Sequence, residues 1–377
     1  MDKNANNNSL PKIIAMYLPQ FHCIPENDEF WGKGFTDWVT VRNAQSLYDG
    51  HEQPRIPLNN NYYDLSLKSD VEWQAKLAKE YGIYGFGIYH YWFNNDKNLL
   101  TKPAEIILKN EEIDINFFFA WDNGNWKRSW SNVAGNDWAP AMEKTKKKGE
   151  PAVLIPYILG GKQDWETHYN SLRPYFHDKR YIKKDNKPVF IIFNYDQKIS
   201  EMCDYWNELA KKDGLNGVFF IFRYKESYNI PSDKYVFRYE PLFSGWSSIP
   251  SFSVRLKRKL KSVMGGTVSP TIYSYDEIWD KILDNTRNIC DKKIYPGAFV
   301  AYDDTPRRGS RGVVVKNSTP EKFRSYLSQL ISMVQNQKKD FIFLTAWNEW
   351  GEGAYLEPDS VYQMNYLKVI KDIYDNE

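Results

Sequence analysis

The sequence predicts an α/β protein, and within that class a single (β/α)8 TIM barrel whose long βα loops form an active-site rim. Eight short apolar runs recur along the 377 residues, and helical patterns lie between several of them. Most of these runs are apolar throughout, as expected of strands that are buried on both faces. A doubly wound open sheet has the same local pattern, and the number of strands favours the barrel. We expect one catalytic domain over residues 1–377.

The expected strands and helices follow one another along the chain. The strands are KIIAMYL from Lys12, IYGFGIYHYW from Ile83, IDINFFFAW from Ile113, PAVLIPYI from Pro151, KPVFIIFNY from Lys187, GVFFIF from Gly217, YPGAFVAY from Tyr295 and KDFIFLTAW from Lys339. The helices are DVEWQAKLAKEYG from Asp70, APAMEKTKKKG from Ala139, ISEMCDYWNELAKKDG from Ile199 and TPEKFRSYLSQLISMVQNQ from Thr319. Three helical patterns end at glycine, and the last begins with the Thr-Pro pair typical of an N-cap and the first helical residue. Loop insertions at about 20–67 and 239–268 interrupt the pattern, and long loops after the strands are where a barrel holds its active site.

The composition narrows the class of partner. Lysine plus arginine (50) nearly balances aspartate plus glutamate (48), so no overall field favours nucleic acid. Aromatic residues make up 16% of the chain and often stand beside asparagine, aspartate or glycine. Such residues suit a cleft that stacks sugar rings, because their faces supply contact area and their polar tips supply hydrogen bonds.

The cysteines and the N-terminus predict a cytoplasmic location. Cys23, Cys203 and Cys290 are far apart and show no C-x-x-C spacing, which argues against a disulfide framework or a structural zinc site. The N-terminal residues are polar, and no run approaches the ~18–20 apolar residues of a membrane span. The five histidines show no ligand spacing such as H-E-x-x-H, so no metal is expected. Motifs for nucleotide hydrolysis, dinucleotide redox chemistry and serine esterases are absent, and no cofactor is expected.

Segments that follow the predicted strands are polar and aromatic together, which indicates a shared site at one rim. They are PQFH, YHYWF, AWDNGNWKRSW, RYEP, AYDDTPRRG and WNEWGEG. Within TAWNEWGEGAYLEPD, from Thr345, the candidate catalytic residues are Glu349 and Glu352. Glycan chemistry needs a carboxylic acid and a second carboxylate ~5–10 Å away, and residues three apart on a helical turn lie about 5–6 Å apart at Cβ. Proximity would also separate their pKa values into one acid and one base. The alternative is a pair of solvated glutamates that favour a helix dipole.

Further rim residues are candidates for substrate binding. They are Tyr17, His22, Trp38, Tyr89, His90, Trp92, Trp121, Asp122, Asn125, Trp126, Tyr239, Glu240, Trp347, Asn348 and Trp350. For the histidines the alternative is a packed or hydrogen-bonded core residue, and for the tryptophans it is a cap on the barrel mouth.

Two basic segments suggest an anionic partner. VRLKRKLKSVMGG, from Val254, is short and amphipathic, and residues 254–261 could make weak contact with an anionic membrane surface or a pyrophosphate-bearing donor. The alternative is a solvated face. RRGSR, from Arg307, is a second cationic loop.

Five blocks in order along the chain carry a resemblance to a known family. They are YLPQFHCIPENDEFWGKGFTDW from Tyr17, YGFGIYHYWF from Tyr84, AWDNGNWKRSW from Ala120, KPVFIIFNY from Lys187 and AWNEWGEGAYLEPD from Ala346. Together they resemble the WbsX-type proteins of bacterial surface-polysaccharide loci, which in turn resemble glycoside hydrolase family 99. The resemblance implies a (β/α)8 barrel and places the two catalytic carboxylates at Glu349 and Glu352. It implies retention, in which the first glutamate deprotonates the sugar 2-hydroxyl to give a 1,2-anhydro sugar and the second acts as acid and then base. The hydrolases commonly have histidine where this chain has Gly351.

The resemblance implies a glycosyltransferase of O-antigen or capsule metabolism that acts on a glycan. A sugar nucleotide or a lipid-pyrophosphate-linked acceptor are the candidate partners. One alternative is a family 99-like retaining endo-glycosidase that cleaves α-mannosyl or α-rhamnosyl linkages. The other is a non-catalytic glycan-binding barrel.

Overall fold

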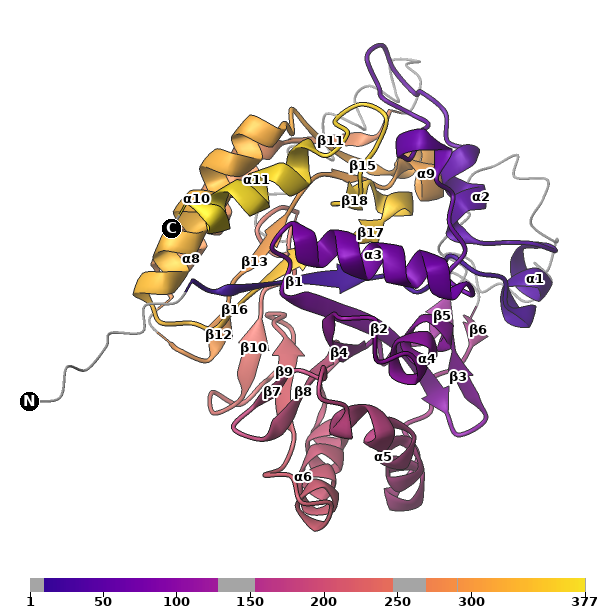
Figure 1. Ribbon diagram of the computed structural model, residues 1–377, viewed down its shortest axis with the longest axis vertical. Coiled ribbons are helices and arrows are strands. Elements are labelled where there is room, and N and C mark those ends of the chain that lie inside the picture. Colours follow the sequence, from indigo (N-terminus) through magenta and orange to yellow (C-terminus); the bar gives the residue numbers. More distant parts are fainter. Residues whose placement is uncertain (1–9, 128–152, 247–268, 290, 377) are drawn as a thin grey trace, which may run out of the picture.

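Parallel strands form the centre of the molecule in the computed structural model, which describes residues 10–127, 153–246, 269–289 and 291–376. The main strands are β1 Lys12–Tyr17, β2 Gly85–Asn94, β4 Asn116–Trp121, β8 Lys187–Ile192, β9 Phe219–Arg223, β10 Tyr235–Phe237, β12 Ile294–Tyr295, β13 Gly297–Phe299 and β16 Phe341–Thr345. Each pairs in parallel with its neighbour in the sheet. Only Pro296 separates β12, which pairs with β10, from β13, which pairs with β16. The two short strands therefore act as one broken strand that closes the ring, and the predicted barrel is confirmed (Figure 1).

One predicted barrel strand is wrong. The run from Pro151 contains β6, Val153–Ile155, which pairs antiparallel with β5, Trp126–Lys127, outside the barrel. Strands β4 and β8 pair directly, and the eighth barrel strand is instead β10, between β9 and β12, where no strand was predicted. The reason is length: β10 has only three residues, and Lys234 and Arg238 flank it, so no apolar run marks it.

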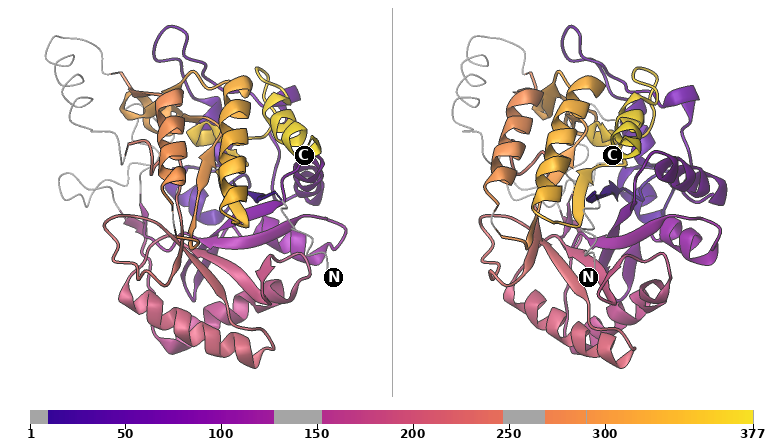
Figure 2. Two further views of the ribbon diagram at one scale, coloured as in Figure 1. Left: turned by 90° about the vertical axis from the view of Figure 1, so that its left-hand side faces the viewer. Right: turned by 60° about the vertical axis from the view of Figure 1, so that its left-hand side comes forward.

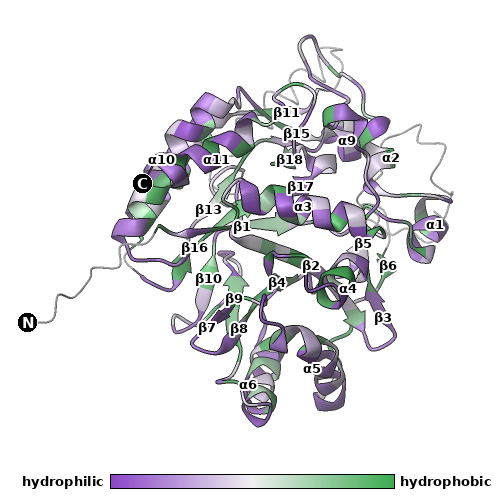
Figure 3. Cartoon of the chain, in the orientation of Figure 1, coloured by the Kyte–Doolittle hydropathy of each residue, from purple (hydrophilic) through white to green (hydrophobic). Residues whose placement is uncertain are grey.

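Helices surround the strands. They are α1 Pro25–Trp31, α2 Asp37–Arg42, α3 Lys68–Glu80, α4 Lys102–Lys109, α5 Lys162–His177, α6 Gln197–Lys212, α8 Tyr275–Arg287, α9 Thr305–Arg308, α10 Pro320–Asn336 and α11 Asn365–Asp375. Figure 2 shows α5 and α6 on one side of the strands and α8, α10 and α11 on another. In Figure 3 many of the central strands and one face of several helices are hydrophobic, while the other helix faces are hydrophilic, as expected of a barrel core.

Three of the four predicted helices are confirmed as α3, α6 and α10. Thr319 caps α10 as expected, since its hydroxyl accepts a hydrogen bond from the Lys322 amide at 3.3 Å. The predicted helix from Ala139 lies outside the described residues. So does the basic segment 254–261. No helix in the described ranges combines the length and apolar character needed to cross a membrane.

Small elements gather at the carboxyl ends of the barrel strands. β14 Tyr302–Asp303, β15 Val313–Lys316 and β11 Thr271–Ser274 form a three-stranded sheet. β17 Asn348–Glu349 and β18 Ala354–Tyr355 form a hairpin around the 3-10 turn η3, Trp350–Glu352. Other short elements are η1 Leu58–Asn60, β3 Lys97–Leu99 and η2 Gly309–Arg311. β7 Lys183–Lys184 lies elsewhere, because it pairs with the first residues of β8. Helices α2 and α9 both contact η3, so the first long loop and the segment after β13 meet at this turn.

Candidate active site

The hairpin that carries Glu349 and Glu352 is fixed to the end of β1. The Trp347 amide donates to the Met16 carbonyl at 2.7 Å. The Asn348 side chain accepts from the Leu18 amide at 2.7 Å and donates to the Leu18 carbonyl at 3.0 Å. The Asn348 side chain therefore satisfies both backbone hydrogen-bonding groups of Leu18, as a neighbouring strand would. All these groups are buried.

A tight turn brings both glutamates to one side of the hairpin. The sequence predicts a helical turn here, and the structure has a single 3-10 turn that Glu349 precedes and Glu352 ends. Gly353 follows with φ +57°, and a Cβ at this position would lie 3.0 Å from atoms of Asp303. Glycine is therefore favoured at position 353 by both backbone conformation and space.

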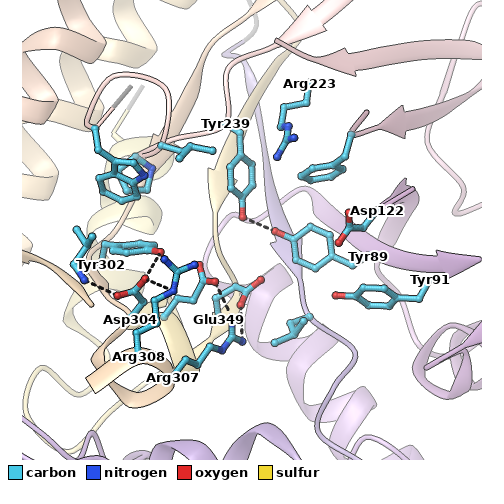
Figure 4. A pocket seen from close by; sticks show the side chains of 17 residues that line it. Tyr89, Tyr91, Asp122, Arg223, Tyr239, Tyr302, Asp304, Arg307, Arg308 and Glu349 are labelled. Atoms are coloured by element: carbon cyan, nitrogen blue, oxygen red, sulfur yellow. Dashed lines mark hydrogen bonds and ion pairs between the residues drawn. The ribbon is translucent and has the colours of Figure 1, made fainter. Parts of the chain in front are cut away.

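Both glutamates line a cavity of about 380 Å³ at this end of the barrel (Figure 4). Its other lining residues are Leu18, Tyr89, Tyr91, Asp122, Phe193, Arg223, Tyr239, Pro241, Leu242, Trp246, Tyr302, Asp304, Arg307, Arg308 and Val313. The volume is in the range of ordinary small-ligand sites, ~300–1,000 Å³. The wall contains both aromatic rings and charged groups, so the cavity can stack a ring and hydrogen-bond its substituents.

Arg307 joins the two glutamates to a third carboxylate. Its Nη1 lies 2.7 Å from Oε1 of Glu352, and its Nη2 lies 3.3 Å from Oε2 of Glu349 and 3.3 Å from Oδ2 of Asp37. Asp37 also accepts from the Gly351 amide at 3.0 Å. Arg307 and Asp37 are buried, so their charges are compensated mainly by each other and by the glutamates.

The protonation of Glu349 differs from that of an ordinary glutamate. Burial, together with the nearby charge of Glu352, raises the pKa of Glu349 to about 8, although Arg307 opposes the change. Across the cavity the Tyr89 and Tyr239 hydroxyls lie 2.7 Å apart, and burial raises the pKa of both phenols. The site thus offers a carboxyl that keeps its proton near neutral pH and two neutral phenols as hydrogen-bonding groups.

The structure brings five of the predicted site residues to the cavity wall: Tyr89, Asp122, Tyr239, Glu349 and Glu352. Four others lie behind the wall and support the hairpin: Trp38, Trp347, Asn348 and Trp350. The Trp350 indole donates to Glu357 at 2.6 Å and stacks on Tyr355 with ring centroids 3.7 Å apart. Trp38 packs against Trp350 with centroids 5.4 Å apart. These side chains are buried, so they hold the turn in place and do not face the cavity.

Four predicted residues, His90, Trp92, Trp121 and Trp126, pack away from the cavity. The Nε2 atoms of His90 and of His168 in α5 lie 2.8 Å apart, and Trp92 stacks on His168 with centroids 4.4 Å apart. Burial lowers the pKa of His90 to about 3, so this ring is neutral. Trp121 donates its indole hydrogen to the Trp92 carbonyl, and Trp126 stacks on Tyr91 and Phe93.

The last four predicted residues are also outside the cavity lining. Tyr17 donates to Gln74 at 2.7 Å, and Asn125 accepts from the Tyr157 amide at 2.7 Å. His22 is buried, and burial lowers its pKa. Glu240 is buried, accepts from Ser244, and has a pKa that burial raises to about 7.

Sequence reasoning did not single out several lining residues. Tyr302, Asp304, Arg307 and Arg308 lie in AYDDTPRRG, a segment expected at the rim, so the signal was the position after a strand. Arg223 ends β9 and would have been found by the same rule. Asp37, which completes the ion pairs, lies in the first long loop, and its spacing from residue 307 gives no signal. No group of three or more His, Cys, Asp or Glu side chains in the described ranges is placed to hold a metal ion.

Comparison of the sequence with known proteins identifies the family of the chain. The sequence profile of the family described as glycosyltransferase WbsX matches residues 13–370. A relative named uncharacterized protein WxcX, from Xanthomonas campestris pv. campestris strain B100, is 29% identical over 354 residues, which cover 92% of this chain and 47% of the relative. The chain thus spans about half the length of the curated relatives it matches.

Two solved structures share the fold. One is described as a glycoside hydrolase-like protein, with a TM-score of 0.58, 12% identity, and coverage of 99% of this chain and 96% of the other. Another is a family 99 endo-alpha-mannosidase from Bacteroides thetaiotaomicron, with a TM-score of 0.54, 12% identity, and coverage of 97% and 96%. At such identity the likeness concerns the fold alone. The chain therefore belongs to the glycosyltransferase WbsX family, a family of carbohydrate-active enzymes, and has a barrel like that of glycoside hydrolase family 99.

Proposed function

We propose that this protein is a retaining glycosyltransferase of bacterial surface-polysaccharide assembly, with Glu349 and Glu352 as its catalytic pair. The observation that carries the proposal is that both carboxylates, from one rigid turn, line a single aromatic cavity at the carboxyl ends of the barrel strands. Active sites of this fold lie at that end of the barrel.

The chemistry follows the route that the family resemblance implies. Glu349 in its carboxylate form takes the proton of the sugar 2-hydroxyl while the 2-oxygen attacks the anomeric carbon. The bond to the leaving oxygen breaks, and Glu352 in its acid form protonates that oxygen, which yields a 1,2-anhydro sugar. Because the pKa of Glu349 is about 8, this step needs the enzyme form in which Glu349 has lost its proton. Glu352 then takes a proton from the acceptor hydroxyl, which attacks the anomeric carbon, and Glu349 returns its proton to the 2-oxygen. The two inversions at the anomeric carbon give net retention.

The lining residues supply candidate contacts for the glycan. Tyr89, Tyr91 and Tyr239 offer ring faces and hydroxyls, and Asp122 offers an acceptor. Arg223 and Arg308 are cations at the wall, which suits a sugar nucleotide or a lipid-pyrophosphate-linked partner. A transferase and a hydrolase differ in whether a sugar hydroxyl or water reaches the intermediate, so the acceptor has to be tested directly.

Mass spectrometry of oligosaccharide products tests the proposal. The purified protein is incubated with α-mannosyl and α-rhamnosyl oligosaccharides, with and without a panel of sugar nucleotides. Lengthening that needs a nucleotide supports the transferase. Shortening without a nucleotide identifies an endo-glycosidase, and binding without turnover identifies a glycan-binding barrel. Either result contradicts the proposal.

Variants link any turnover to the carboxylate pair. Glu349→Gln and Glu352→Gln keep the side-chain size and remove the acid or base, and we expect a loss of ~10²-fold or more for each. The matched control is Glu111→Gln, because the Glu111 side chain is 79% exposed and pairs only with Lys179 among the interactions described. Full activity in both cavity variants would remove the pair from the mechanism.

A further inference from the structure

Three arginine side chains line the cavity, and two of them are paired with carboxylates. Arg307 forms ion pairs with three carboxylates, and Arg308 lies 3.2 Å from a carboxylate oxygen of Asp304. Arg223, the last residue of β9, is the third arginine. Figure 4 shows it on the opposite side of Tyr239 from the other two, so it belongs to a different part of the cavity wall.

The contacts of Arg223 are with neutral groups. Its Nη2 donates to Oδ1 of Asn194 at 3.3 Å, and its guanidinium carbon lies 5.1 Å from the centre of the Phe193 ring. In the ranges that the structure describes, no carboxylate forms an ion pair with Arg223, and its Nε is buried without a hydrogen-bond partner. A half-buried cation of this kind is stabilised when a ligand supplies the opposite charge.

The oxygen that accepts from Arg223 is itself held in place. The Asn194 amide donates to Oδ1 of Asn123 at 2.8 Å, and the Asn123 side chain donates to the Asn194 carbonyl at 2.8 Å. Tyr228 donates its hydroxyl hydrogen to Oδ1 of Asn194 at 2.6 Å. Asn123 and Asn194 follow the paired strands β4 and β8, so these bonds join two strand ends. The guanidinium is therefore pre-organised for a ligand.

Asp122 is the acidic neighbour of Arg223 on this part of the wall. Burial raises the pKa of Asp122, and the positive charge of Arg223 opposes that change, so the two side chains interact electrostatically without forming an ion pair. A ligand that suits both has a hydroxyl group to donate to Asp122 and one anionic group to accept from Arg223. An acidic sugar has both groups, whereas a diphosphate would bring additional negative charge close to Asp122.

We propose that Arg223 is a specificity-determining residue that binds the carboxylate of an acidic sugar in the glycan, while Asp122 accepts a hydrogen bond from a hydroxyl of the same sugar. The proposal rests on the proposed function, which takes this cavity as the glycan site. The planar guanidinium can donate two parallel hydrogen bonds to a carboxylate, which a lysine ammonium cannot do. Arg223 thus selects the substrate and takes no part in making or breaking bonds.

Equilibrium binding of charged and uncharged forms of the same sugar tests the proposal. The ligands are trisaccharides that contain glucuronate, galacturonate or mannuronate. Each is compared with its methyl ester, which keeps the hydroxyl groups and removes the charge. Dissociation constants are measured by ligand-observed NMR. In the unaltered protein we expect at least one of the acids to bind ~10-fold or more tightly than its ester.

Variants assign this preference to the arginine. Arg223→Met removes the cation, so an acid and its ester should bind equally. Arg223→Lys keeps the charge without the planar fork and should retain only part of the preference. The affinity for the ester is the check on folding, because it should be the same in the unaltered protein and in Arg223→Met. Arg324→Met is the matched control, since Arg324 is an exposed residue of α10 that pairs with Asp372.

Three outcomes would overturn the proposal. They are no preference for any acid in the unaltered protein, a preference that survives Arg223→Met, and a preference that is lost in Arg308→Met but not in Arg223→Met. UDP and inorganic pyrophosphate are measured in parallel. If they bind through Arg223 and none of the sugar acids does, the anion is a phosphate and the assignment to an acidic sugar is wrong.

Because binding is measured without turnover, failure of this proposal is distinct from failure of the proposed function. A protein that turns over neutral glycans and shows no preference for an acid would keep its proposed function and lose this role for Arg223. A preference that depends on Arg223 in a protein without turnover would do the reverse.

Discussion

Replacement of Glu357 by glutamine should change how the stability of the protein depends on pH. Glu357 lies beneath the turn η3, is buried, and accepts hydrogen bonds from Trp350 and Gln74 at 2.6 Å and from Tyr63 at 2.8 Å. Burial raises its pKa to about 7, although these donors oppose the change. The native carboxyl therefore keeps a proton that the unfolded chain loses above its usual pKa of 4.5.

The size of the effect follows from this difference. Since the native state binds more protons than the unfolded state between pH 4.5 and 7, raising the pH through this window lowers the free energy of unfolding. A pKa difference of about 2.5 units at ~1.4 kcal/mol per unit gives about 3.5 kcal/mol from this group over the whole window. Glutamine does not titrate, so the variant lacks this part of the pH dependence.

Guanidinium chloride unfolding at pH 5 and pH 8 measures the effect. Between these pH values, which span most of the window, we expect the unaltered protein to lose about 2.5 kcal/mol more than Glu357→Gln. The other buried carboxyls with raised pKa values, Glu240, Asp304 and Glu349, act in both proteins and cancel in the comparison. Parallel pH dependences would refute the reasoning, because they would mean that the three donors stabilise the Glu357 carboxylate as well as water does.

The remaining predictions concern the hairpin and the cavity wall. Asn348→Ala should lower the free energy of unfolding by about 2–4 kcal/mol in chemical denaturation, because it leaves the buried Leu18 amide and carbonyl without their partner. Tyr239→Phe should lower it by only about 1 kcal/mol but weaken glycan retention in affinity electrophoresis, whereas unchanged retention would exclude this hydroxyl from binding. Burial raises the pKa of Asp304 to about 6, so this group lowers the free energy of unfolding as the pH rises from 4 to 6. Asp304→Asn should lack this contribution when the two proteins are compared by denaturant titration.

The sequence predicted those parts of the fold that have a local signal. Long apolar runs such as those at Lys12 and Lys339 became barrel strands, and the Thr-Pro start of the last predicted helix became the N-terminus of α10. The three-residue strand β10 has no such run, and only its neighbours β9 and β12 define it. A strand set by its partners and not by its own residues cannot be identified from local pattern.

The candidate site was predictable to the level of the segments but not of the side chains. The position after a strand placed His90, Trp92 and Trp121 at the rim, yet the structure turns them into the aromatic packing around His168. Alternation along a strand decides which face a side chain takes, and an aromatic-rich strand does not mark which face is the cavity. Arg307 was visible only as part of a cationic loop, because its three carboxylate partners come from distant positions.

The contacts at the turn η3 also determine when the site can form during synthesis of the chain. The Gly351 amide and the Asp37 carboxylate that meet there are 314 positions apart in the chain. A ribosome has to synthesise the chain beyond residue 351 before these groups can meet, so a nascent chain that ends earlier would lack the assembled carboxylate group. A carbohydrate-active enzyme would then acquire reactivity only when its barrel is complete. Co-expressed fragments divided in a surface loop between α6 and β9 would have to reassociate before either half contributed to a working site.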